Sequence, residues 1–166
     1  YILLKHDDTH ELRSLKDPEF KLESKDFTMD KESIQNIAVL NNGRIFVICY
    51  ESGYFNFFDR QGNARDTRFR RSKMIKLGTN YEHFKAISDD EIAMSDPQGS
   101  LFTIKVTQVA DGIDTKMSFL PFGMKQTSGF WVVQKDTKQY IFFTIKGESK
   151  VTVCDYSSRK KLAEFD

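Results

Sequence analysis

The chain has 166 residues, of which 39% are hydrophobic and 30% charged, so it can form one domain with a packed core and is not wholly disordered. Lysine and arginine nearly balance the acidic residues, and a formal net charge of +1 gives no global field that would favour nucleic acid or an anionic membrane. No apolar stretch approaches the roughly 20 residues of a membrane-spanning helix, so we expect no membrane partner.

The first residues, 1–16, predict two strands on either side of the polar stretch HDDTH. On a strand, His6, Asp8 and His10 would share one face, which is an arrangement that a divalent metal uses. Aspartate and histidine are also common in turns, and the stretch lies where a turn is expected. We therefore expect a solvated turn here and no metal site.

The next residues, 17–33, are predicted to form a charged connector. Pro18 argues against a continuous strand, because proline cannot donate a hydrogen bond to a strand ladder. Asp17 and Pro18 could begin one helical turn, but the apolar spacing that follows does not support a helix.

Three segments, which begin at Ile37, Phe84 and Val133, repeat without gaps. Each predicts strand, tight turn, strand, tight turn and strand, because apolar columns alternate with turn-forming residues in register. The shared columns are Ile45, Ile92 and Ile141; Phe55, Phe102 and Val151; Asn56, Thr103 and Thr152; and Phe57, Ile104 and Val153. A fourth short strand is predicted after each segment, at 64–69, 113–119 and 161–165.

This repeat predicts an all-β fold of β-propeller blades, each with four antiparallel strands. We assign residues 1–166 to a single domain, with a partial blade at 1–16 and the connector at 17–33. The full blades are predicted at 34–69, 81–120 and 129–166. Because propellers contain about four to eight blades, we expect an incomplete or fragmentary propeller. An ordinary sandwich or barrel is the alternative.

The stretch YFNFFD in the first repeat places aromatic side chains on both faces of one strand. Stacked blades would bury such a strand from both sides, with Phe55 and Phe57 packing one way and Tyr54 and Phe58 the other. Asp59 is then predicted to be a turn residue that ends the strand.

The segment KVTVCDYSSRKKLAEF, at 150–165, resembles the third strand, turn and fourth strand of a WD40 repeat. In this resemblance Cys154–Asp155 stands where the family has its Trp-Asp pair, and Phe58–Asp59 and Lys105–Val106 take the same place in the earlier repeats. No Trp-Asp or Gly-His pair occurs, so the hydrogen-bond network of those residues is not carried over. The resemblance covers nearly the whole chain and implies a platform within a multisubunit complex.

The strongest local charge feature is RDTRFRRSKMIK, at 65–76, which is predicted to be an exposed link between two blades. Guanidinium groups bind phosphate and carboxylate bidentately, so a phosphate group, an acidic peptide or a nucleic-acid backbone is a candidate ligand. The alternative is a solvated linker balanced by acids such as Asp89 and Asp90. The candidate binding residues are Arg65, Arg68, Phe69, Arg70, Arg71, Lys73 and Lys76.

The sequence contains no recognisable catalytic motif. The stretches DPQGS and NNGR lack the lysine of a phosphate loop, and no Cys-x-x-Cys occurs. The His-x-x-x-His spacing occurs at His6 and His10, within the HDDTH stretch already assigned to a solvated turn. Cys49 and Cys154 lie in apolar strand-like runs and are predicted to be buried free thiols in a reducing compartment, cytoplasmic or nuclear. Asp7–Asp8 and Asp89–Asp90 are predicted turn residues. We expect no enzyme, no catalytic residue, no cofactor and no metal.

The function predicted from these features is a noncatalytic protein-interaction scaffold, with other proteins or further blades of the same chain as partners. One alternative is a ligand-binding or enzymatic propeller with its site at the channel mouth, and another is nucleic-acid or phosphate binding through 65–76. An incomplete propeller would expose the apolar sides of its terminal blades. The isolated chain should therefore be insoluble or oligomeric, through its open blade edges.

Overall fold

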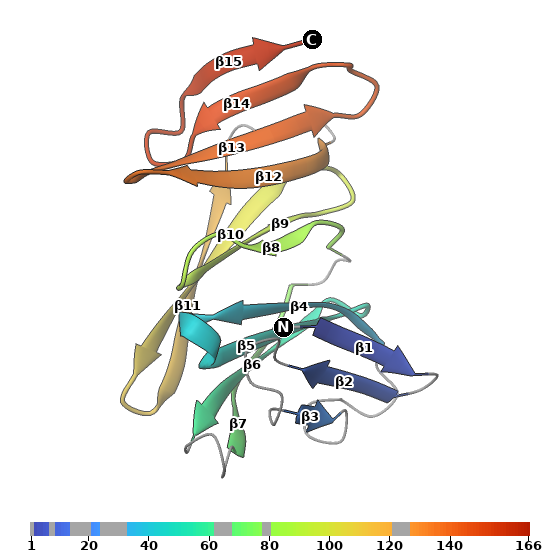
Figure 1. Cartoon of the computed structure of the whole chain (residues 1–166), viewed down its shortest axis with the longest axis vertical. Coiled ribbons are helices and arrows are strands. Elements are labelled where there is room, and N and C mark those ends of the chain that lie inside the picture. Colours follow the sequence, from blue (N-terminus) through green and yellow to red (C-terminus); the bar gives the residue numbers. More distant parts are fainter. Residues whose placement is uncertain are drawn as a thin grey trace. The chain divides into compact units, whose positions relative to one another are not determined.

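The computed structural model describes residues 2–6, 9–13, 21–23, 33–61, 68–77, 81–120 and 127–166 (Figure 1). These residues form four antiparallel sheets, and one short helical element, η1 at Asn41–Gly43, accompanies them. The all-β prediction is confirmed.

The chain divides into two compact units. The first contains Tyr1–Gly78 and Thr107–Asp114, and the second contains Thr79–Val106 and Thr115–Asp166. Each unit is described by itself below.

The first sheet of the first unit has the strand order β1-β2-β3. Its strands are β1 (Ile2–His6), β2 (Thr9–Arg13) and β3 (Lys21–Glu23). The predicted strand pair around HDDTH is present, and β3 lies within the predicted connector at 17–33, where the sequence indicated no strand. Leu22 of β3 is opposite Leu12 of β2. Three residues are too few for an alternating pattern to be visible in the sequence.

The second sheet has the order β4-β5-β6-β7. Its strands are β4 (Ile34–Leu40), β5 (Ile45–Tyr50), β6 (Tyr54–Gln61) and β7 (Arg68–Lys76). The turn from β4 to β5 passes through Asn41, Asn42 and Gly43, whose φ angles of 48°, 51° and 91° are left-handed. Asparagine and glycine are the residues that adopt this conformation most readily, so the NNGR stretch forms the predicted turn.

The last strand of this sheet corrects the prediction. A strand was expected at 64–69 and a basic linker after it, but β7 starts at Arg68 and pairs with β6 as far as Lys76. The sheet therefore extends beyond residue 69. Arginine and lysine are typical of exposed links, but they also suit an edge strand, which is open to water along one side. Composition alone could not distinguish the two.

The aromatic strand β6 is buried on both faces, as predicted. The side chains of Phe55 and Phe57 are 0% exposed and that of Phe58 is 3% exposed. Phe58 lies opposite Phe46 and packs with it in a cluster on one face, whereas Phe55 and Phe57 alternate to the other face. The prediction for Asp59 is wrong, because Asp59 is buried within β6 instead of ending it at a turn.

The second unit contains most of two further sheets, with the orders β11-β10-β9-β8 and β12-β13-β14-β15. The strands of the first are β8 (Phe84–Ala86), β9 (Glu91–Ser95), β10 (Leu101–Val109) and β11 (Gly112–Leu120). Those of the second are β12 (Thr127–Lys135), β13 (Lys138–Ile145), β14 (Val151–Asp155) and β15 (Lys161–Phe165). Three of the four described sheets therefore have the four antiparallel strands predicted for a blade.

The core of the second unit lies between these two sheets. One sheet contributes aliphatic side chains such as Leu101 and Leu120, and the other contributes Phe130, Ile141 and Phe143. The side-chain Nε2 of Gln139, on β13, also donates a hydrogen bond of 3.0 Å to the backbone carbonyl of Ile87. Cys154 belongs to this core, and Cys49 is buried in the first unit. Both cysteines are free, as predicted.

The columns of the gapless repeat do not keep one strand register. In the β4–β7 sheet Ile45 lies opposite Asp59, two residues beyond Phe57, and the last sheet is one residue out. Ile92 lies opposite Ile104, but Ile141 lies opposite Cys154 instead of Val153. A shift of one residue reverses the face on which a side chain lies. Thr103 and Thr152, which share a column of the repeat, consequently both belong to faces that meet the core between the two sheets.

Candidate functional site

The structure describes only part of the predicted basic site. Arg65 lies outside the described residues, and so do the side chains of Arg68, Phe69 and Arg70. The described side chains, those of Arg71, Lys73 and Lys76, lie on strand β7 and not on a loop.

The described basic side chains of β7 all contact neighbours in the same unit. The guanidinium carbon of Arg71 lies 5.9 Å from the centre of the Phe58 ring, and Lys76 Nζ lies 4.8 Å from the centre of the Tyr54 ring. Lys73 Nζ lies 3.0 Å from Asp114 Oδ1. Since Arg71 and Lys76 are opposite Phe58 and Tyr54, they share one face, and Lys73 lies on the other. The structure therefore does not bring these three cations together.

The predicted metal alternative cannot be followed in the structure, because Asp7 and Asp8 lie outside the described residues, as do the side chains of His6 and His10. Among the residues that are described, no three histidine, cysteine or acidic side chains are grouped as metal ligands.

Among the buried titratable groups of the two units are a thiol and a phenol held in their neutral forms and one paired carboxylate. Burial raises the pKa of the Cys49 thiol to about 12, so this thiol is not an available nucleophile near neutral pH. Burial also raises the pKa of Tyr156 to about 12, and nearby Glu91 adds to the effect. Asp59 is buried in an ion pair, with its Oδ1 3.2 Å from Arg44 Nε, and its Oδ2 accepts a hydrogen bond of 3.3 Å from Gln108 Nε2. The two contacts of Asp59 hold its buried carboxylate within the first unit.

The most distinctive surface of the second unit is one face of its last sheet, which we call the open face. It carries the exposed side chains of Trp131, Val133, Leu162 and Phe165, which are 49%, 46%, 55% and 56% exposed. Trp131 lies opposite Phe142 in the ladder, so β12 and β13 contribute to the same face. Large apolar side chains grouped at this exposure are typical of interaction surfaces.

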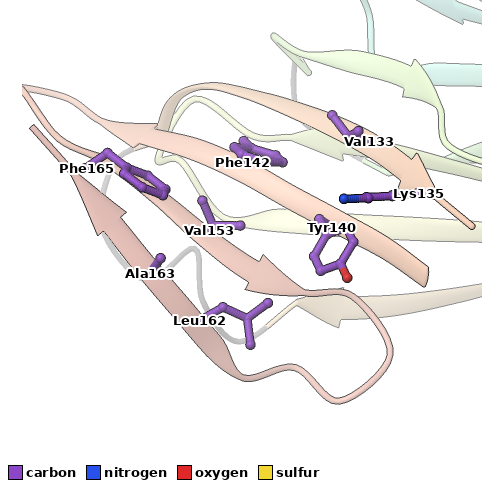
Figure 2. Close-up of a pocket in the computed structure, with 8 residues that line it drawn as sticks. All are labelled: Val133, Lys135, Tyr140, Phe142, Val153, Leu162, Ala163 and Phe165. Atoms are coloured by element: carbon purple, nitrogen blue, oxygen red, sulfur yellow. The ribbon is translucent and has the colours of Figure 1, made fainter.

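The open face is hollowed into a trough of about 310 Å³ (Figure 2). Its lining comes from all four strands of the sheet, because alternate side chains of neighbouring strands point the same way. The lining residues are Val133, Lys135, Tyr140, Phe142, Val153, Leu162, Ala163 and Phe165. Lys135 is the one charged member of this set.

The charges around the trough are not evenly neutralised. Lys150, which precedes β14, has its Nζ 3.0 Å from Glu164 Oε1 of β15, and Lys161 also pairs with Glu164. Glu164 is opposite Thr152 and so belongs to the covered face of the sheet. These two lysines lower the pKa of the Glu164 carboxyl. In the trough, by contrast, Lys135 makes no ion pair with a carboxylate of the described chain.

The open face was predicted only in outline. The sequence predicted that the last blade of an incomplete propeller would expose an apolar side, but it did not single out the residues. The signal was present as alternation at Trp131 and Val133 and again at Tyr140 and Phe142. Both faces of this sheet are apolar, however, so the sequence could not show which one another sheet covers.

Comparison with solved structures identifies the architecture. Sqt1 from Saccharomyces cerevisiae matches 96% of this chain with a TM-score of 0.64 and 11% identity. The WD40 domain of SCAP from fission yeast matches 98% with a TM-score of 0.64 and 11% identity. The β-propeller domain of Cps50 (Swd1) from Myceliophteria thermophila matches 96% with a TM-score of 0.61 and 10% identity. The chain has a β-propeller fold.

The propeller is partial. The chain spans 42% of the Sqt1 chain, 41% of the SCAP chain and 51% of the Cps50 chain, about half or less of each. The four-stranded sheets are therefore blades, and the likeness to WD40 propellers concerns the fold. By sequence, no family model and no curated protein matches the chain. No helix within the described ranges is long and apolar enough to cross a membrane.

Proposed function

We propose that the chain is a noncatalytic protein-interaction platform, and that the open face of the last blade is where a partner protein binds. The observation that carries the proposal is the exposure of Trp131, Val133, Leu162 and Phe165 on one continuous sheet face. The similarity to WD40 propellers supports a scaffold role in general terms.

The residue types on the open face fit this role. Tryptophan and tyrosine are enriched among the residues that dominate binding energy at protein interfaces. Trp131 lies on this face opposite Phe142, and Tyr140 follows on the same face opposite Val133. The blade is also rigid, because its other face packs in the core of the second unit. A partner would therefore meet a preformed surface with little ordering cost.

The partner that we propose is a protein presenting an apolar strand or sheet. A flat sheet face can be covered by a second sheet about 10 Å away, and the opposite face of this same blade is covered in that way by β8–β11. A role as a subunit within a larger complex follows from such an interface. Further blades and a second copy of the chain are the other occupants that an experiment should distinguish.

Site-specific photocrosslinking tests this function. A photoreactive phenylalanine derivative at position 133 is compared with the same residue at Asp89, an exposed position of the β8–β9 turn outside the open face. In cells that make the chain, we expect protein adducts from position 133 only. A second substitution, Phe142→Asp, should remove them. Adducts that form equally at both positions, or survive Phe142→Asp, would contradict the proposal, as would their absence from position 133.

A further inference from the structure

We propose that the partner strand on the open face combines apolar side chains with one carboxylate, and that this carboxylate pairs with Lys135. The inference rests on the proposed interaction function and specifies the chemistry of the partner for the same face. It follows from the position of Lys135, the charges beside it and the spacing of the residues in the trough.

Lys135 is the cation inside the trough. Its side chain extends into the hollow beside Tyr140, and the remaining lining side chains are uncharged (Figure 2). Within the described chain, no carboxylate forms an ion pair with it. An ammonium beside apolar surface attracts an anion more strongly than one in open water, because the effective dielectric constant is lower there.

The charged neighbours of Lys135 do not pair with it. Lys138 lies directly opposite Lys135 in the β12–β13 ladder, and like charges in that position are unfavourable. Asp155, opposite Tyr140 on β14, already accepts a hydrogen bond of 2.6 Å at Oδ1 from the backbone N–H of Ser158. Asp136, in the turn between the two lysines, is paired with neither in the described chain. The two aspartates therefore equal the two lysines in number. Hydrogen bonds from Ser158 lower the pKa of Asp155, and Lys138 lowers it further, so Asp155 acts with Lys138. Lys135 is left without a carboxylate partner in the described chain.

The lysines at the last two strands do not offer a second such cation, because they are outside the trough lining and already paired. Lys150 and Lys161 both pair with Glu164, and Lys150 Nζ also lies 3.9 Å from Asp166 Oδ1. Lys135 is therefore the lining cation with which a partner carboxylate can pair, and this places the carboxylate near the β12–β13 turn.

The spacing on β12 specifies the partner further. Val133 and Lys135 are two residues apart on one strand, so they share a face and are separated by roughly 7 Å along it. An extended partner with apolar side chains at alternate positions, followed by an acid two positions on, matches this spacing. A partner with glutamine or lysine at that position would leave Lys135 unpaired or repelled.

The test uses the single tryptophan of the chain, Trp131, as the reporter. Three blocked peptides that alternate valine and threonine, and differ only in a last glutamate, glutamine or lysine, are titrated while tryptophan emission is followed. We expect the glutamate peptide to bind about threefold to fivefold more tightly than the glutamine peptide at low salt, the range of a partly exposed ion pair. Lys135→Gln should remove this preference, and Lys135→Glu should transfer it to the lysine peptide. Lys138→Gln is the matched control and should retain most of it.

The outcomes separate this inference from the proposed function. Saturable binding of all three peptides without a charge preference would overturn the role of Lys135 and leave the open face as a binding surface. No change in Trp131 emission with any peptide would count against both. Assembly into a defined dimer that shields Trp131 and excludes the glutamate peptide would show that a second copy occupies the face, and would also overturn the inference.

Discussion

The two faces of the β12–β15 blade are made of similar residues but have different surroundings. On the covered face, Phe143 and Ile141 are buried in the core against the neighbouring sheet. On the open face, Phe142 and Val133 line a trough with a lysine at one end. Adjacent residues on one strand thus belong to a stabilising core and to a binding surface. Apolar character alone does not distinguish these roles, and the neighbouring blade decides between them.

The largest effect should come from truncating the covered face. Phe143→Ala should lower the free energy of unfolding by about 3–5 kcal/mol, because the side chain is 3% exposed and leaves a cavity. Phe142→Ala, on the same strand and the opposite face, is the matched control and should cost much less while weakening partner binding. Urea denaturation measures both. Equal losses would contradict the distinction between the faces.

Burial on the covered face should also change how the free energy of unfolding depends on alkaline pH. Tyr156 packs in the core of the covered face, and its pKa is raised from 10.0 to about 12. Because the unfolded chain releases this proton first, the stabilisation is complete below pH 10 and lost as the pH rises toward 12. The loss is on the order of 2 kcal/mol. Tyr156→Phe should flatten the profile of unfolding free energy in this range, and Tyr140→Phe on the open face is the control. If Tyr156→Phe and the unaltered chain lost the same free energy of unfolding at alkaline pH, this explanation would be contradicted.

A smaller effect is expected on self-association. Without its partner, the chain should sediment as oligomers of mixed size or be poorly soluble, because the open face stays in water and no defined dimer is expected to cover it. Val133→Glu places a charge in the trough and should weaken the association by about tenfold, the result of roughly 1.4 kcal/mol. Asp89→Asn, away from the face, should not. Analytical ultracentrifugation measures the association of each variant. A monodisperse monomer of the unaltered chain at high concentration would refute the prediction.

The smallest effect should come from the basic strand β7. If 65–76 binds nucleic acid, affinity for a random duplex should fall steeply with salt, and Lys73→Gln should lower the slope of log K against log salt by about 1. Because Lys73 is already paired with Asp114, we expect weak binding and little change. Fluorescence anisotropy at several salt concentrations measures the slope, and a flat dependence removes this alternative.

Much of the fold could be predicted from the sequence because its repeat is carried by local patterns. Turn residues and alternating apolar residues predict the strands, and the burial of Phe55, Phe57 and Phe58 follows from aromatic residues on both faces of one strand. The register of the last blade could not be predicted, because the turn before Val151 holds one residue more than the aligned turn before Leu101. A sequence column shows which residues recur but not which side of a strand they occupy.

The candidate site was harder to predict because its defining property is the absence of a neighbour. The run of arginines at 65–76 attracted attention as the strongest charge feature, whereas Arg71 and Lys76 lie over aromatic rings of the same sheet. Lys135 is unremarkable in the sequence. It becomes informative only when the strand pairing places it in an apolar trough opposite another lysine.

The one-residue shift in the last blade also limits how the repeats can be recombined. A chimera that replaced β14 with β10 by following the gapless columns would turn the strand inside out, exposing the side chains that meet the covered core. Exchanging the whole hairpin from β13 through β14, with its own turn, would preserve the orientation of every side chain. The exchangeable module in this chain is therefore the hairpin with its turn, and a single strand is not a unit that can be transplanted.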